Sequence, residues 1–352
     1  MRDRSIDTGR GLLVLMMVYG HVMQFFGDAS LFPLTDTLIN IINLTVFPTF
    51  VFYFGATAVL AYLDKPYKRA LPGMAKTTLR SLVAFYLSGI GYRILREKKP
   101  FAVGTVRKIL WLEDIPGWSE FLVSFALYSL LLIVAFKGLQ WLSHRPLAAL
   151  AVGAACLAAS ILVPYGAVKP AWLQLIIGGR DFACFPIVQY MPYFLAGMIF
   201  ARGGRAMHLR LLAIAAVCSA AGIAAAVIDG GLPGRFPPQW SWIVLPALLC
   251  AAVVAASKGI CALGGGGIRR AADMLRDALS HFGSRSLYYL LTSNLVLFTL
   301  SGAGIAPVMK RKSVLPWTAV IQSPKGALVW TGLLLAALWF VTVLAGRSAK
   351  KK

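Results

Sequence analysis

Long apolar runs constrain the fold of this 352-residue chain more than any other feature. Each run is about 17–25 residues long, enough for a helix to cross the hydrocarbon core of a bilayer. The runs lack the alternation of period two that is typical of a membrane barrel strand. Helices and closed barrels are the structures that satisfy their backbone hydrogen bonds inside lipid. The sequence therefore predicts an all-α bundle of about ten transmembrane helices, over residues 9–26, 38–62, 79–95, 117–136, 147–164, 185–201, 209–228, 240–261, 283–302 and 326–346.

Composition agrees with an integral membrane protein and leaves no room for a separate soluble domain. Hydrophobic residues make up 59% of the chain and charged residues 14%, so we expect one membrane domain over residues 1–352. The first run lacks a small-x-small cleavage site, and we expect a retained helix in place of a signal peptide. The five cysteines show no CxxC spacing and are predicted to be small buried hydrophobic residues, with no metal site.

The charge balance is strongly basic, with 35 Lys and Arg against 13 Asp and Glu. Basic residues are more frequent in the loops that face the cytoplasm if the N-terminus is inside, which predicts that orientation and contact with anionic membrane lipid. No basic stretch is interleaved with aromatic residues, so we expect no nucleic-acid partner. Two basic clusters fall in predicted outer loops, around residues 93–108 and at 310–312. They indicate either a misplaced span or an anionic partner outside.

The first apolar run carries ionisable residues on one face. Arg10 and His21 are eleven positions apart, which places them on one stripe of a helix about 16 Å apart along its axis. Asp7 lies three residues before Arg10 and can pair with it. Ionisable groups are costly in lipid and usually mark a pathway or a reaction centre. The alternative for His21 is a hydrogen-bonded histidine between packed helices.

Four further segments place polar or basic side chains beside the apolar runs. The basic loop after the second run suits either the positive-inside rule or a phosphorylated cosubstrate. The segment before the fourth run resembles an anchored polar lid, and its last acid either enters a cavity or pairs with a nearby arginine. The polar face of the ninth run either lines a site or joins helices. The candidate residues are Arg69, Lys76 and Arg80 in the loop, Trp118 and Glu120 in the lid, Arg180 in the 165–184 connection, and Ser286, Tyr288 and Ser293 in the ninth run.

Three motifs, taken in order, resemble the membrane acyltransferase-3 family. Its pattern of an Asp, an Arg-Gly three residues on and a His after ten intervening residues corresponds to Asp7, Arg10-Gly11 and His21. Residues 47–55 and 283–291 are similar to its Pro- and Phe-rich stretch in the second span and its Gly-x-x-Ser-Leu-x-x-Tyr-Leu run. The family commonly has a His after this run, and the corresponding region here, around Ser293, has none. The family's Arg-x-x-Arg pattern corresponds to residues 77–80, Thr-Thr-Leu-Arg, which keep only the second Arg.

The resemblance implies an enzyme of a bacterial cytoplasmic membrane that transfers an acyl group, usually acetyl, from acyl-CoA to an extracytoplasmic glycan or lipid-linked acceptor. It implies that His21 is the base or the acyl carrier, and that Arg10, positioned through Asp7, orients the donor. The basic residues of the loop, Arg80 and Lys76 above all, would hold the phosphates of CoA. The remaining candidates are assigned to the acceptor.

Two other classes of protein stay open at this point. A transporter of a small anionic solute also places intramembrane His and Arg beside helices broken by Pro and Gly. A catalytically inactive acyltransferase-like protein is compatible with the motif departures. A homo-oligomer is compatible with the sequence, and nothing in the sequence defines one.

Overall fold

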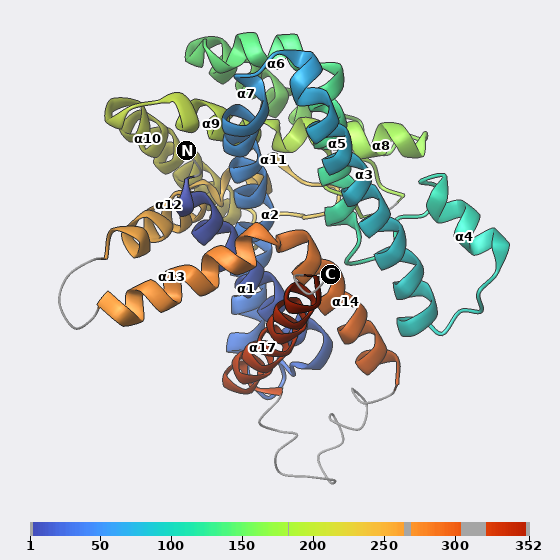
Figure 1. The fold of residues 1–352 in the computed structure, drawn as a ribbon. Helices are drawn as coiled ribbons and strands as arrows, with labels where there is room; N and C mark the ends of the chain where they lie inside the picture. Colours follow the sequence, from blue (N-terminus) through green and yellow to red (C-terminus); the bar gives the residue numbers. More distant parts are fainter. Residues whose placement is uncertain (1–2, 182, 264–268, 304–321, 350–352) are drawn as a thin grey trace. The chain divides into compact units, whose positions relative to one another are not determined.

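The computed structural model describes residues 3–181, 183–263, 269–303 and 322–349, and every regular element in these ranges is helical (Figure 1). The basic cluster at 310–312 lies outside the described residues. The α-helices are α1 (Arg4–Phe26), α2 (Leu34–Ala58), α3 (Tyr67–Gly91), α4 (Val103–Leu110), α5 (Glu120–Val134), α6 (Phe136–Ser143), α7 (Pro146–Leu162), α8 (Ala171–Ile177), α9 (Ile187–Arg202), α10 (Arg205–Ile228), α11 (Trp240–Val244), α12 (Ala247–Ala262), α13 (Arg269–Ser284), α14 (Ser286–Gly302) and α17 (Pro324–Ala349). Short π-helical segments, η1 (Val59–Leu63) and η2 (Tyr92–Arg96), continue α2 and α3.

Among the described residues, five helical segments are long and apolar enough to cross a membrane. They are Arg4–Phe26, Leu34–Leu63, Arg205–Ile228, Trp240–Ala262 and Pro324–Ala345. The pair α5 and α6, bent by 87° at its break, gives a sixth if it counts as one span. The all-helical membrane class is thus supported, but ten spans are not confirmed. Several predicted spans are too short to count as membrane-crossing helices: α7, α9 and α14 have only 17, 16 and 17 residues.

One long helix was not predicted from the sequence. Residues 262–282 were expected to form an inner loop, whereas residues 269–284 form α13, whose polar and apolar residues lie on opposite faces. Its apolar face buries Ala272 and Leu279.

The chain forms two compact units, each described here by itself. The first contains Met1–Val46, Ile90–Phe101 and Ser257–Lys352, and the second contains Phe47–Gly89 and Ala102–Ala256. In the first unit, α13, α14 and α17 pack around α1 (Figure 1). Glycines bring α13 and α1 into backbone contact: a Cβ at Gly283 would overlap the carbonyl oxygen of Asp7, and one at Gly11 would overlap that of Leu279.

Reciprocal glycines also join α2 and α9 in the second unit. Gly55 lies against the backbone of Phe194, and Gly197 lies against the backbone of Phe52. Because neither glycine has a Cβ, the backbones of α2 and α9 can approach this closely. Beside this contact, Phe47 stacks on Phe185 with ring centroids 3.9 Å apart.

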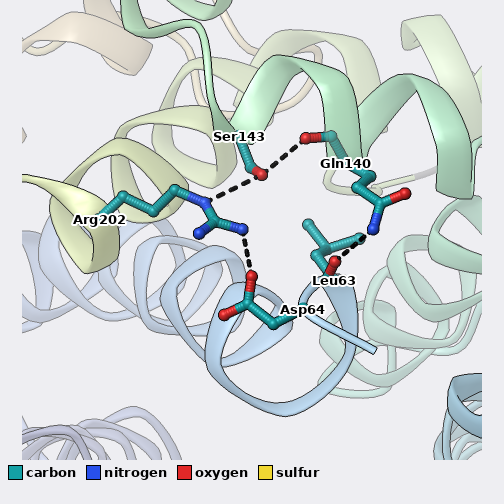
Figure 2. A network of polar contacts seen from close by, with 5 residues as sticks. All are labelled: Leu63, Asp64, Gln140, Ser143 and Arg202. Carbon is teal, nitrogen blue, oxygen red and sulfur yellow. Dashed lines mark hydrogen bonds and ion pairs between the residues drawn. The ribbon is translucent and has the colours of Figure 1, made fainter. Parts of the chain in front are cut away.

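A polar network joins the ends of three helical segments in the second unit (Figure 2). The Arg202 guanidinium, at the end of α9, forms an ion pair with Asp64 after η1 and donates to the Ser143 hydroxyl at 3.1 Å. Ser143 donates to the Gln140 carbonyl at 2.7 Å, and the Gln140 amide donates to the Leu63 carbonyl at 2.7 Å. The ends of η1, α6 and α9 therefore lie together.

Candidate active site

The candidate site lies in the first unit, along the interface of α1 and α14. Helix α1 begins at an N-cap, Asp3, whose carboxylate accepts a hydrogen bond from the Ser5 amide at 2.8 Å. It then continues as one unbroken helix, so Asp7, Arg10 and His21 share the stripe predicted for them. Asp7 is buried, and the side chains of Arg10 and His21 are half-buried.

At the first level of the interface, the Arg10 guanidinium donates to the Ser286 hydroxyl at 2.8 Å. Ser286 is the first residue of α14 and follows directly on the junction with α13. Nearby, Thr8 and Ser280 share a hydrogen bond of 3.1 Å, which ties α13 to the same turn of α1. The structure thus brings together two predicted residues, Arg10 and Ser286, from opposite ends of the chain.

At the second level, Nδ1 of His21 lies 2.8 Å from Oδ1 of Asn294. Asn294 is fully buried in α14. Because an amide oxygen only accepts hydrogen bonds, Nδ1 of His21 carries the proton, and the neutral imidazole has its lone pair on Nε2. That tautomer is the one a base or a nucleophile needs at Nε2.

Asn294 was not among the predicted site residues, whereas its neighbour Ser293 was predicted to bind the acceptor. Ser286 and Ser293 are two helical turns apart, so periodicity alone places them on one stripe. In the structure, however, the buried Ser293 hydroxyl donates to the Leu290 carbonyl of its own helix at 3.2 Å. The longer amide one residue later reaches His21.

The two levels also define the direction of the helices. Arg10 and then His21 meet Ser286 and then Asn294, so α1 and α14 are parallel. The two contacts are about 16 Å apart along α1 and about 12 Å apart along α14.

Helix α17 runs the opposite way to α1. Its start lies beside the later part of α1, where the Tyr19 hydroxyl donates to the Pro324 carbonyl at 3.0 Å. Its later part lies beside α13, where Thr342 is 3.1 Å from Nε2 of His281.

The polar stripe of α1 continues one turn beyond His21. Gln24 donates through its amide to the Asn43 carbonyl oxygen on α2 at 3.2 Å. The stripe therefore meets polar partners at three successive levels, on α14 twice and on α2 once.

An unpredicted histidine lies at the junction of α13 and α14. Nδ1 of His281 accepts from the Arg285 guanidinium at 3.2 Å. Burial lowers the pKa of His281, and the charge of Arg285 lowers it further. This imidazole is therefore kept neutral, with its Nε2–H directed to Thr342.

The residues predicted to hold the phosphates of CoA lie in the second unit. Arg69, Lys76 and Arg80 are all exposed on α3. Spacings of seven and four residues place them within about 20° of one face of that helix. They do not belong to the unit that contains Arg10 and His21.

The residues predicted to bind the acceptor are distributed over both units. Glu120 is buried at the start of α5, and Trp118 precedes it in a left-handed conformation with φ of 60°. Arg180 is exposed in the connection before α9. Tyr288 is half-buried in α14, its ring edge-on to Tyr289 with centroids 5.2 Å apart.

No protein-family model matches this chain, and no curated protein matches it at a significant level. The resemblance to the acyltransferase-3 family therefore stays a prediction, carried by the three motifs.

Proposed function

We propose that this chain is a membrane-bound O-acyltransferase, which moves an acyl group, usually acetyl, from acyl-CoA to a hydroxyl of a glycan or lipid-linked acceptor. The observation that supports the proposal most is the hydrogen bond between His21 and Asn294. It lies on the same stripe of α1 as the hydrogen bond between Arg10 and Ser286. An oriented imidazole and a cation on one stripe are the groups that acyl transfer from an anionic thioester requires.

In this proposal His21 acts through Nε2. As a base, it takes the proton of the acceptor hydroxyl while that oxygen attacks the thioester carbonyl; the C–S bond breaks, and the proton passes to the CoA thiolate. As an acyl carrier, Nε2 attacks the carbonyl itself and the C–S bond breaks; the acceptor oxygen then displaces the imidazole, and the proton of its hydroxyl passes to the CoA thiolate. Asn294 holds Nδ1–H in both routes, so the lone pair of the resting neutral imidazole is on Nε2.

Arg10 would bind the anionic part of the donor. Its hydrogen bond to Ser286 holds the guanidinium at the first level of the interface, about 16 Å along α1 from His21. A donor lying along the helix, with its extended pantetheine arm between the two levels, would contact both. Asp7 would position Arg10 from the preceding turn.

We also propose the ten-span arrangement, with a cytoplasmic N-terminus in a bacterial cytoplasmic membrane. If α1 and α14 both cross the bilayer, their parallel direction requires an odd number of crossings between them. The ten-span arrangement has seven, and the opposite direction of α17 agrees with its place as the last span. The basic loops would then contact the anionic headgroups of the inner leaflet.

Purified full-length protein in nanodiscs, mixed with radiolabelled acetyl-CoA, tests this function. We expect release of CoA with labelling of an acceptor, and His21→Ala should lower the rate at least a hundredfold, since it removes the base or carrier. His144→Ala, at an exposed histidine after α6, is the matched control and should keep full activity. Full activity of purified His21→Ala protein would refute the proposal. Binding without release would indicate an inactive acyltransferase-like protein, and solute uptake into liposomes would indicate a transporter.

A further inference from the structure

A buried carboxyl group, Glu120, and a half-buried arginine, Arg235, interact electrostatically in the second unit, which does not contain the site above. Glu120 is 9% exposed at the start of α5. Arg235 lies in the connection between α10 and α11, its guanidinium carbon 5.2 Å from the ring centre of Phe185 and 4.6 Å from that of Phe236. We call these four residues the Glu120–Arg235 cluster.

Both charged groups of the cluster keep an unused polar atom. Within the described ranges, Oε2 of Glu120 and Nε of Arg235 are buried and have no hydrogen-bond partner. No ion pair of 4.0 Å or less joins the two side chains in this part of the chain. The two groups nevertheless interact electrostatically. Burial lowers the pKa of Arg235, and the nearby carboxylate of Glu120 raises it again in part. Native proteins rarely leave such atoms unsatisfied without a water, an ion or a ligand.

The cluster lies at a defined end of the second unit. Phe185 lies two residues before the start of α9, whereas Arg202 ends that helix. The cluster and the polar network of Figure 2 are therefore at opposite ends of α9. In the proposed topology the network faces the cytoplasm and the cluster faces outward, toward an entering acceptor.

We propose that the Glu120–Arg235 cluster binds a neutral hydroxyl-bearing ligand, a sugar unit of the acceptor glycan. A hydroxyl donates to Oε2 and accepts from Nε at the same time, so one group satisfies both unused atoms. The cluster combines one carboxyl group with one guanidinium, so it offers no set of like charges for a strongly anionic or cationic ligand. The rings of Phe185 and Phe236 supply apolar surface for the C–H face of a sugar.

The identification of the bound sugar as the acceptor rests on the proposed acyltransferase function. Sugar binding at the cluster does not depend on that function. The two are therefore measured separately on the same full-length protein in nanodiscs. Sugar binding is measured by isothermal titration with cellobiose, maltose and N,N′-diacetylchitobiose, with glucuronate and glucosamine as charged probes. Acyl transfer is measured as CoA release from acetyl-CoA with and without each disaccharide, because CoA release by the base route requires an acceptor.

We expect at least one neutral disaccharide to bind, at least tenfold more tightly than either charged probe. Glu120→Gln and Arg235→Gln should each weaken that binding at least tenfold. Glu113→Gln, at an exposed acid in the connection before α5, is the matched control and should bind sugar normally.

Removal of one buried charge can unfold the protein, because the other charge is left without compensation. The double variant Glu120→Gln/Arg235→Gln removes both charges, and its thermal unfolding is compared with that of the wild type. Loss of sugar binding in this folded double variant supports the proposal. A wild type that binds no disaccharide of the panel, or a double variant that binds as tightly as the wild type, overturns it and leaves ordered water as the occupant. Sugar binding without CoA release would keep this site and refute the acyltransferase.

Discussion

Asn294 determines which nitrogen of His21 carries the proton. The contact of 2.8 Å joins Nδ1 to an oxygen that can only accept, so the reactive lone pair is placed on Nε2. Asn294 is thus a positioning residue in the proposed reaction, because it acts through His21. Ser293, its buried neighbour, is satisfied within α14 and serves as a natural comparison.

Replacement of Asn294 by alanine should lower kcat roughly tenfold to a hundredfold, the usual effect of removing the partner that orients a functional histidine. The KM for acetyl-CoA should stay close to the wild-type value, since donor binding is assigned to Arg10. Asn294→Asp keeps an acceptor oxygen and should recover most of the loss. Steady-state kinetics on purified protein separates kcat from KM. Equal kinetics for Asn294→Ala and Ser293→Ala would contradict the positioning role.

At the scale of elements, the interface of α1 with α13 depends on glycine. Gly283 and Gly11 let the two backbones touch, and any Cβ there would meet the carbonyl oxygen of Asp7 or of Leu279. Main-chain atoms cannot rotate away as a flexible side chain can, so the helices would have to separate. This contact sets the register of α1 against the junction where Arg10 meets Ser286.

Gly283→Ala should therefore destabilise the protein by about 1–3 kcal/mol, the usual cost of overpacking. It should also lower activity, because α14 begins three residues after Gly283 and carries Ser286 and Asn294, the partners of Arg10 and His21. Gly332→Ala in α17 is the control, since a Cβ there meets nothing within 4 Å. Thermal unfolding in nanodiscs gives the comparison. An unfolding midpoint for Gly283→Ala at or above that of Gly332→Ala would show that the backbone contact is unimportant.

At the scale of the whole molecule, the first unit is assembled from both ends of the chain and the second from its middle. Each unit has its own polar cluster: the line from Arg10 to His21 in the first, and Glu120 with Arg235 in the second. In the second unit, the network around Arg202 also marks one end of the helices (Figure 2). The two ends of that unit should therefore face opposite sides of the membrane.

Cysteine labelling of a variant without native cysteines tests this arrangement. Lys65→Cys, Arg145→Cys and Gly204→Cys lie beside the network, at exposed positions, and should react with an impermeant reagent from one side only. Lys169→Cys and Leu232→Cys, also exposed, lie in connections at the other end and should react from the opposite side. Under the proposed topology the first group is cytoplasmic. Labelling of both groups from the same side would refute it.

The sequence by itself determined the helical membrane class and the stripe of Asp7, Arg10 and His21. Both depend on local properties, the length of an apolar run and the period of a helix, which need no knowledge of the partner helices. Ser286 was predicted to bind the acceptor, and only the structure shows that its hydroxyl accepts a hydrogen bond from Arg10.

Only the tertiary structure decided which side chains meet. It paired His21 with Asn294, revealed α13 as a helix against α1, and brought Arg235 within electrostatic reach of Glu120. These contacts join residues far apart in sequence, and their register depends on how closely two backbones approach. That distance is set at positions such as Gly283, where the absence of a single Cβ lets two helices touch.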